Sequence, residues 1–349
     1  MTISSQPAVW QDAQTLCCIE RRQETADAAT FVLRPLQPLA VSYQPGQFLL
    51  LTVEIDGQPH SRAYSLCSSP SRSADLAVTV KRVANGLVSN WLLDHFHAGD
   101  TLNAQHPTGA FFLPADYSAP KILLCSAGSG ITPMMSMARW LLDNQHPADI
   151  FFLYSARHAD DIIFRDELMT MAATHPRFKL FLILDTVTDA FPCYQGFLNP
   201  ALFNALVPDL TDCHNFMCGP SVYMDAVEHM LRERGFPMAN SHKESFTPAA
   251  PLNTETSTTN QQFRLEVPGF GASSEISNQQ TVLEALESLQ LPIIGACRSG
   301  ICGSCKCKVV SGSVEDISTQ PGPLTEEDKQ QGYILACSSR ASSDLELEL

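Results

Sequence analysis

The sequence of 349 residues predicts a multidomain protein with three consecutive domains: an antiparallel β-barrel, a doubly wound α/β domain and a small α+β domain. Short strand-like runs between turn residues predict the barrel over residues 16–118. Longer apolar runs that alternate with helical stretches predict the α/β domain over residues 119–246. A polar segment at residues 247–262 separates these two domains from residues 263–349. Residues 1–15 are interpreted as a tail.

The barrel prediction rests on several short runs of aliphatic, aromatic and β-branched residues that turn residues separate. They lie at residues 31–33, 48–55, 62–67 and 76–83. Strands spaced in this regular way are typical of small antiparallel barrels.

The character of the sequence changes at Lys121. From there the apolar runs are nearly continuous, which is typical of strands that are buried on both faces of a parallel sheet. Helical stretches lie between them, so the pattern indicates a Rossmann-like arrangement. The expected strands include residues 122–125, 150–154, 178–184 and 215–218, and the expected helices are residues 134–142, 161–171 and 222–234.

The segment at residues 247–262 is rich in Thr, Pro and Asn and contains one aliphatic residue of any size. It buries too little apolar surface to order itself, so we interpret it as a linker. After it, Thr281 and Glu284 form a capping box that starts a short helix, and Thr325 and Asp328 form a similar start. These elements predict an independent α+β domain.

Composition limits the class of protein. A hydrophobic content of 44% and a charged content of 17% are ordinary for globular proteins. No apolar run approaches the roughly 18 to 20 residues of a membrane span, and the first residues lack the features of an export signal. The net charge of −15 disfavours nucleic-acid binding, and twelve cysteines suit a reducing compartment. We therefore expect a cytoplasmic protein without membrane insertion.

Four cysteines near the C-terminus form the most specific pattern in the chain. Cys297, Cys302 and Cys305 are separated by four and two residues, and Cys337 follows later. This spacing is typical of a plant-type [2Fe–2S] cluster, whose two irons need four thiolates. Glycines and a serine in the gaps let the backbone pass close to the sulfides. Residues 263–349 are therefore predicted to be an electron-carrying ferredoxin domain of the β-grasp type.

Zinc is the main alternative metal that these four cysteines could bind. Structural zinc sites favour two close cysteine pairs, and the spacing here differs from that arrangement. Disulfides are disfavoured because nothing in the chain suggests export. Cys307 lies at an alternating position in the strand-like run after the loop, and we interpret it as a packed or surface thiol.

A glycine loop follows the first strand of the α/β domain. It contains Gly128, Gly130 and Thr132, and Pro133 fits the first turn of the next helix because it lacks an N–H group. A helix N-terminus that glycines expose can bind an anion such as a nucleotide phosphate. By itself the loop is also compatible with a plain turn from a strand to a helix.

A second loop, Cys218-Gly219-Pro220, ends a later strand of the same domain. Parallel strands place it at the same carboxyl edge as the first loop, where α/β sheets bind ligands. Cys218 alone is typical of a small buried side chain.

In their order and spacing, these motifs resemble the ferredoxin–NADP reductase superfamily over nearly the whole chain. Arg62, Tyr64 and Ser65 match its R-x-Y-S signature, which implies that Arg62 pairs with a flavin phosphate, Tyr64 stacks on the isoalloxazine ring and Ser65 approaches N5. Gly86 and Ser89 are similar to the turn that holds the pyrophosphate of FAD. The resemblance thus implies FAD as the flavin.

The resemblance also assigns the nicotinamide half of the site. Gly128, Gly130, Thr132, Gly219 and Pro220 match its nucleotide loops. Glu244 and Phe246 are similar to the acidic and aromatic residues that close over the flavin.

The implied catalytic residues are Ser65, Cys218 and Glu244, at the place where hydride passes from the nicotinamide to the flavin. Arg157 could meet a 2′-phosphate, but Asp160 and Asp161 would repel one, so NADH is expected rather than NADPH. A flavin can stand between NADH, which gives hydride, and a cluster, which takes single electrons.

The domain order is that of phthalate dioxygenase reductase-like proteins, and further segments resemble the NADH oxidoreductases of hybrid-cluster proteins. The resemblance implies such a protein as electron acceptor, with reduction of hydroxylamine or nitric oxide by that partner. A reductase component of a Rieske or diiron oxygenase shares all the motifs and is the alternative. A non-enzymatic redox-sensing or zinc-binding interaction module is the alternative from another class.

Overall fold

The structure is a computed structural model, which describes residues 8–10, 13–72, 75–186, 191–246, 261–295, 297–298, 300–318 and 322–349. Most of the expected tail at residues 1–15 and of the expected linker at residues 247–262 lies outside the described residues. The contacts divide the chain into two compact units, Met1–Ser245 and Phe246–Leu349. Among the described residues, no helix has both the length and the apolar character that crossing a bilayer requires.

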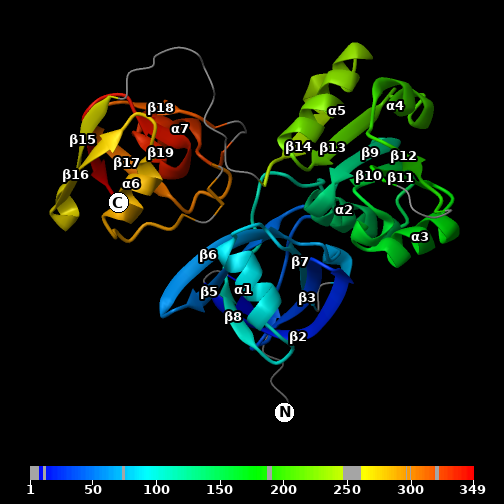
Figure 1. Cartoon of the computed structure of the whole chain (residues 1–349), viewed down its shortest axis with the longest axis horizontal. Coiled ribbons are helices and arrows are strands. Elements are labelled where there is room, and N and C mark those ends of the chain that lie inside the picture. The colour runs from blue at the N-terminus through cyan, green and yellow to red at the C-terminus, as the bar shows by residue number, and fades with distance from the viewer. Residues whose placement is uncertain are drawn as a thin grey trace. The chain divides into compact units, whose positions relative to one another are not determined.

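The first unit begins with a six-stranded antiparallel sheet in the order β6-β5-β8-β2-β3-β7 (Figure 1). A bridge between Leu66, directly after β6, and Val78 of β7 joins the two edges of the sheet, which confirms the expected barrel. Its interior is packed with aliphatic and aromatic side chains, among them Phe31, Leu49 and Phe96. The elements are β2 (Gln14–Thr25), β3 (Ala28–Pro35), β5 (Phe48–Ile55), β6 (Gln58–Ser65), β7 (Leu76–Lys81), α1 (Leu87–His95) and β8 (Thr101–Ala104), with the short pair β1 (Ala8–Val9) and β4 (Leu39–Ala40).

The rest of the first unit is an α/β lobe built on a parallel sheet in the order β12-β11-β10-β9-β13-β14. Side chains from α2 and α3 pack on one face of this sheet, and side chains from α4 and α5 pack on the other. Because all strands are parallel, their carboxyl ends share one edge. The elements are β9 (Lys121–Ala127), α2 (Ile131–Asp143), β10 (Asp149–Ala156), α3 (Arg165–Thr174), β11 (Phe178–Leu184), β12 (Tyr194–Gln195), α4 (Pro200–Leu206), β13 (Cys213–Cys218), α5 (Ser221–Glu233) and β14 (Ser241–Glu244).

One helix of the α/β lobe begins later than expected. The sequence predicts a helix from residue 161, whereas α3 begins at Arg165. Ala159–Asp161 form a short 3-10 turn, and Phe164 then takes a left-handed conformation with φ of 60°. A bulky residue in this conformation interrupts a right-handed helix, so α3 can begin only after Phe164.

The second unit is a mixed sheet in the order β16-β15-β21-β17-β19, with helix α6 packed on it. This arrangement agrees with the expected α+β domain. Both capping boxes are present: the Thr281 side chain accepts a hydrogen bond from Glu284 N, and the Thr325 side chain accepts one from Asp328 N. The elements are β15 (Gln262–Val267), β16 (Ala272–Ser277), α6 (Val282–Ser288), β17 (Lys306–Ser311), β18 (Val314–Asp316), α7 (Glu326–Gln330), β19 (Tyr333–Leu335), β20 (Ser339–Ala341) and β21 (Leu345–Glu348).

Candidate functional site

Three side chains from neighbouring strands form a row at the carboxyl edge of the α/β sheet. Cys218, the last residue of β13, is in register with Ser126 of β9 on one side and with Glu244, the last residue of β14, on the other. Parallel neighbours in register point to the same face of a sheet. Ser126 and Cys218 are fully buried, and Glu244 is 3% exposed. The row is therefore sheltered from water.

The barrel adds a fourth side chain to this row. Ser65, the last residue of β6, donates a hydrogen bond from Oγ to Oε2 of Glu244 at 3.3 Å. Burial raises the pKa of the Cys218 thiol well above its usual value, and the charge of Glu244 raises it further, so the thiol stays protonated. The structure thus brings together the three residues that the sequence predicts to be catalytic, from three different strands.

Ser126 is a site residue that the sequence analysis missed. Its Oγ is buried and has no hydrogen-bond partner among the described residues. Buried hydroxyls are normally paired, so the unpaired Oγ in register with Cys218 makes Ser126 a candidate site residue. The signal that could have revealed it is its place two residues before Gly128 at the end of a parallel strand.

The glycine loop before α2 packs directly against the end of β13. A Cβ on Gly130 would lie 2.1 Å from the carbonyl oxygen of Cys218, so only glycine allows the two loops to approach this closely. Gly128 has a φ of +56°, and its carbonyl accepts a hydrogen bond from the Tyr154 hydroxyl at 3.1 Å. The Thr132 hydroxyl donates to a carbonyl within the loop at 3.1 Å. The glycine loop therefore leads directly into the N-terminus of α2, beside the end of β13.

The second loop is also tightly packed, though less so than the first. A Cβ on Gly219 would lie 3.2 Å from both Ala127 and the ring of Tyr223. Pro220 is the N-cap residue of α5 and turns the chain into that helix. Both predicted nucleotide loops therefore meet at one edge of the sheet, next to Cys218.

The predicted flavin residues lie along β6. On this strand Arg62 and Tyr64 lie on one face and Ser65 lies on the other. Arg62 donates a hydrogen bond from Nη1 to the carbonyl of the neighbouring Ser61 at 2.7 Å. Tyr64 is partly buried against the barrel core, and burial raises the pKa of its phenol. Arg62 is partly exposed and is paired in register with Leu51 of β5, as Tyr64 is with Leu49.

Gly86 and Ser89 form a tight turn into helix α1, which contacts β6. A Cβ on Gly86 would lie 2.6 Å from Ser89 Oγ, and this hydroxyl accepts a hydrogen bond from the Val83 N–H at 3.3 Å. The predicted pyrophosphate turn is thus a compact structure at a helix N-terminus.

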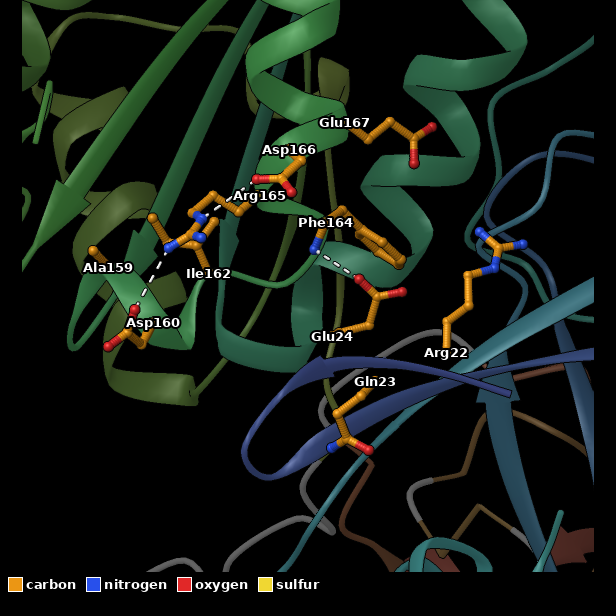
Figure 2. A pocket seen from close by; sticks show the side chains of 10 residues that line it. All are labelled: Arg22, Gln23, Glu24, Ala159, Asp160, Ile162, Phe164, Arg165, Asp166 and Glu167. Carbon is orange, nitrogen blue, oxygen red and sulfur yellow. Dashed lines mark hydrogen bonds and ion pairs between the residues drawn. The ribbon is translucent and has the colours of Figure 1, made fainter. Parts of the chain in front are cut away.

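The loop after β10 holds the residues that were expected to select the nucleotide. Arg157 is exposed and has no side-chain partner among the described residues. Asp160 is 98% exposed and lies 3.5 Å from Arg165. This segment and strand β2 of the barrel line a cavity of about 540 Å³. Its lining side chains, among them Asp160, Arg165 and Arg22, are drawn in Figure 2. Phe246, which was expected to close over the flavin, is 42% exposed and belongs to the second unit.

The four predicted cluster ligands lie in the second unit, and contacts link them to one another. Cys297 lies close enough to Cys302 and Cys337 to raise the pKa of both thiols, and the Cys337 N–H donates to Cys305 Sγ at 3.4 Å. The Gly300 N–H also donates to Cys337 Sγ at 3.2 Å. A set of four thiols with N–H donors directed at sulfur fits a 2Fe–2S cluster.

Cys307 lies away from these contacts. It is 2% exposed in the apolar core of the second unit, and burial raises the pKa of its thiol to about 12. This position agrees with its interpretation as a packed thiol.

Comparison with known sequence families covers most of the chain. Residues 16–113 match the oxidoreductase FAD-binding domain, residues 124–229 match the oxidoreductase NAD-binding domain, and residues 266–342 match the 2Fe-2S iron-sulfur cluster binding domain. The chain belongs to the ferredoxin–NADP reductase superfamily. Within this superfamily it is a member with a C-terminal 2Fe–2S domain.

Relatives of the reductase align over nearly its full length. The glycine betaine monooxygenase reductase subunit of Pseudomonas aeruginosa is 38% identical over 97% of this chain and 96% of its own. The NADH oxidoreductase HCR of Escherichia coli is 37% identical over 87% and 88% of the two chains. The solved structure of phthalate dioxygenase reductase is 27% identical and superposes with a TM-score of 0.65 over 97% and 98% of the chains.

The reductase is therefore an NAD(H)-dependent oxidoreductase that carries FAD and a 2Fe–2S cluster and passes electrons to a protein partner. This result confirms the cofactors and the reaction class that the sequence predicts.

Proposed function

We propose that the reductase is the electron-transfer component of a multicomponent oxygenase and that Ser65, Cys218 and Glu244 form its hydride-transfer site. The observation that carries the oxygenase assignment is the 38% identity to a monooxygenase reductase subunit, because the alignment covers nearly all of both chains. The same alignment includes all three domains, so the order of the electron carriers agrees as well as their presence.

The side chains at the edge of the α/β sheet suit hydride transfer. FAD and the cluster, when bound, supply the conversion of a two-electron hydride donor into single electrons. Glu244 accepts the hydrogen bond of Ser65 and thereby orients its hydroxyl, which is buried at the end of β6. Cys218 remains a neutral thiol, so it adds a small polarizable surface without a second negative charge beside Glu244. The burial of all three residues excludes water from the place where hydride passes.

The residues around the site suit the binding of both dinucleotides. We propose that the forked guanidinium of Arg62 pairs with the FAD phosphate, that Tyr64 flanks the flavin, and that the turn at Gly86 and Ser89 receives the pyrophosphate. The two glycine loops at Gly128–Gly130 and Gly219 would receive NADH. Cys297, Cys302, Cys305 and Cys337 would hold the two irons.

Replacing Ser65 tests the hydride site. Ser65→Ala should retain FAD but reduce the rate of flavin bleaching by NADH about 10-fold or more, because the oriented hydroxyl is lost. Ser61→Ala is the matched control, since Ser61 lies on the same face of β6 and its hydroxyl contacts Thr52 at 2.7 Å instead. Equal rates for the two variants in anaerobic stopped-flow measurements would contradict the role of Ser65.

A hybrid-cluster protein is the second candidate partner. The 37% identity to the Escherichia coli NADH oxidoreductase supports it, as do the segments around Thr132 and Cys218 that the sequence analysis singled out. The two candidates differ in the acceptor alone, so electron transfer to purified acceptors can separate them. The NADH-reduced protein is mixed without oxygen with the oxygenase subunit of glycine betaine monooxygenase or with hybrid-cluster protein. Faster reoxidation of the cluster by the hybrid-cluster protein would overturn the oxygenase assignment.

The charge of the second unit suggests how the acceptor is attracted. Cationic side chains near the cluster loop are already paired: Arg298 with Glu287, and Lys306 with Asp328 at 2.5 Å. Carboxylates therefore dominate the remaining charge of this unit, and we propose that they steer a partner with a basic docking surface. The rate of transfer to that partner should then fall as ionic strength rises, because salt screens exposed charges beyond roughly 8 Å. A flat salt dependence would contradict steering.

A further inference from the structure

Helix α2 lies along the chain segment that follows the flavin strand β6, which we call the β6 extension (residues 66–72). Four side chains of this helix and its C-cap contact the segment. Ser136 donates to the carbonyl of Ser68 at 2.6 Å, and Arg139 donates to the carbonyl of Cys67. Asp143 accepts from Arg72 at 2.9 Å, and Asn144 donates to the Ser71 hydroxyl at 2.7 Å. The contacts follow one face of α2, because residues three and four apart are neighbours on a helix.

Two of these four contacts have buried donor side chains. Ser136 is fully buried, and Arg139 is 8% exposed. The carbonyls that they bind belong to consecutive residues, the second and third after Ser65. A buried carbonyl needs a donor, so the helix supplies hydrogen bonds that this part of the barrel requires. By contrast, the Arg72 side chain in the outer contact is 63% exposed, and exposed ion pairs contribute little.

Arg139 is held firmly in this position. Its Nε and Nη2 donate to the two carboxylate oxygens of Glu167 in α3 at 2.9 and 2.6 Å. Its guanidinium also lies over the ring of Phe164, 4.9 Å from the ring centroid. Burying a charge is costly unless it is paired and hydrogen-bonded, and here the forked pair leaves the third nitrogen free to reach the Cys67 carbonyl. A lysine could not make these contacts simultaneously.

A further contact secures the same junction between the barrel and the α/β lobe. Figure 2 shows the Phe164 N–H directed at Glu24 of β2, with a distance of 3.3 Å to Oε2. The other oxygen of Glu24 accepts a hydrogen bond from the Thr30 hydroxyl at 2.6 Å. The left-handed conformation of Phe164 is therefore stabilised from both sides, by Glu24 through its backbone and by Arg139 through its ring.

We infer that Ser136 and Arg139 are positioning residues for hydride transfer. Helix α2 begins at the glycine loop that would receive NADH, and β6 carries the residues that would receive the flavin. By holding the carbonyls of Cys67 and Ser68, the helix fixes the end of β6 relative to its own N-terminus. The distance between hydride donor and acceptor is then set by contacts made one and two helical turns away from the reaction. This inference rests on the proposed roles of β6 and the glycine loop.

The test compares buried and exposed contacts of the same helix. Ser136→Ala, Arg139→Lys and Arg139→Gln are purified with FAD, and the rate of flavin reduction is followed over a range of NADH concentrations. The limiting rate should fall about 10-fold for Ser136→Ala and up to about 100-fold for Arg139→Gln, because displacements near 1 Å have such effects. The apparent dissociation constant for NADH should change less than about twofold, and Arg139→Lys should be intermediate. Asp143→Ala, which loses the exposed contact with Arg72, should retain the normal rate.

A second measurement does not depend on catalysis. Hydrogen–deuterium exchange of the amides in residues 66–69 should accelerate in the FAD-free Ser136→Ala and Arg139→Gln variants, whereas exchange in β2 should stay unchanged. A normal limiting rate in a flavin-bound Ser136→Ala protein would overturn the inference. A weaker affinity for NADH with a normal limiting rate would also overturn it. If Arg139→Gln fails to fold, the measurements on Ser136→Ala alone decide whether the inference holds.

These measurements test the positioning role of α2 separately from the identity of the electron acceptor. No protein acceptor is present in these measurements, so the identity of the acceptor cannot change them. If Ser65→Ala reduces flavin normally while Ser136→Ala is slow, the role of the Ser65 hydroxyl is refuted and the positioning role of α2 stands.

Discussion

Replacing Gly130 by alanine tests whether the two nucleotide loops depend on close contact. Gly130 has φ of −62° and ψ of −7°, so the backbone conformation accepts alanine. The added Cβ would lie 2.1 Å from the carbonyl oxygen of Cys218, 2.4 Å from its carbonyl carbon and 2.8 Å from the backbone nitrogen of Gly219. All three atoms belong to the backbone at the end of β13, so no side chain can rotate away to relieve the overlap.

The geometry sets the size of the effect. An ordinary contact needs at least 3.4 Å, so the loop and the end of β13 must separate by roughly 1 Å. Overpacking of this kind typically costs about 1–3 kcal/mol, and the reduced freedom of the unfolded chain returns about 0.4–1 kcal/mol. We expect a net loss of about 1–2 kcal/mol, which lowers the unfolding temperature of a domain of this size by roughly 2–8 °C. Because Cys218 moves with the strand end, the rate of flavin reduction should fall about 100-fold.

Thermal unfolding followed by flavin fluorescence and anaerobic reduction by NADH measure the two effects. Gly269→Ala is the control, because a Cβ at Gly269 would meet no atom within 4 Å and the residue has no left-handed backbone. The control should unfold and react like the parent protein. A Gly130→Ala variant with the parental unfolding temperature and reduction rate would refute the reasoning.

Three further predictions concern the cluster, the flavin and pH. Cys302→Ser should remove the visible absorbance of the 2Fe–2S cluster while FAD remains, whereas Cys307→Ser should retain the cluster; loss of the cluster in both variants would disprove the ligand assignment. Arg62→Ala should weaken FAD binding by about 1.5–3 kcal/mol in a titration of the apoprotein, and an unchanged affinity would exclude the phosphate contact. Burial, and then the neighbouring His214, lower the pKa of His242 below its ordinary value of 6.5. The unfolded chain therefore binds its proton first as pH falls below 6.5, so stability should decrease there. His242→Phe should flatten this slope in urea midpoints between pH 7 and 5, and an unchanged slope would assign it to other groups.

Local patterns in the sequence were sufficient for much of the fold. Capping boxes depend on residues three apart, so Thr281 and Thr325 could be assigned as helix starts without the rest of the chain. The carboxyl-edge rule for parallel strands placed both glycine loops together before any register was known. The cysteine spacing was equally local for three of the four ligands.

Features that depend on long-range register or on buried charge could not be predicted. That Cys218 is in register with both Glu244 and Ser126 follows from the alignment of three strands, which the sequence leaves open. Arg139 looks like a solvent-exposed helix residue until Glu167 and the Cys67 carbonyl are brought to it by the fold. The late start of α3 has a similar cause, because Phe164 owes its left-handed conformation to contacts from other elements.

The junction around Arg139 determines where the chain can be divided when chimeras with its relatives are built. A chimera that exchanges only the α/β lobe would bring in a different α2 and leave the Cys67 and Ser68 carbonyls without their donors, unless Ser136 and Arg139 are transplanted with their partners. The boundary between Ser245 and Phe246 separates two units that are each compact. Exchange of the 2Fe–2S unit among relatives should therefore succeed at this boundary. The barrel and the α/β lobe should be exchanged together, as one unit.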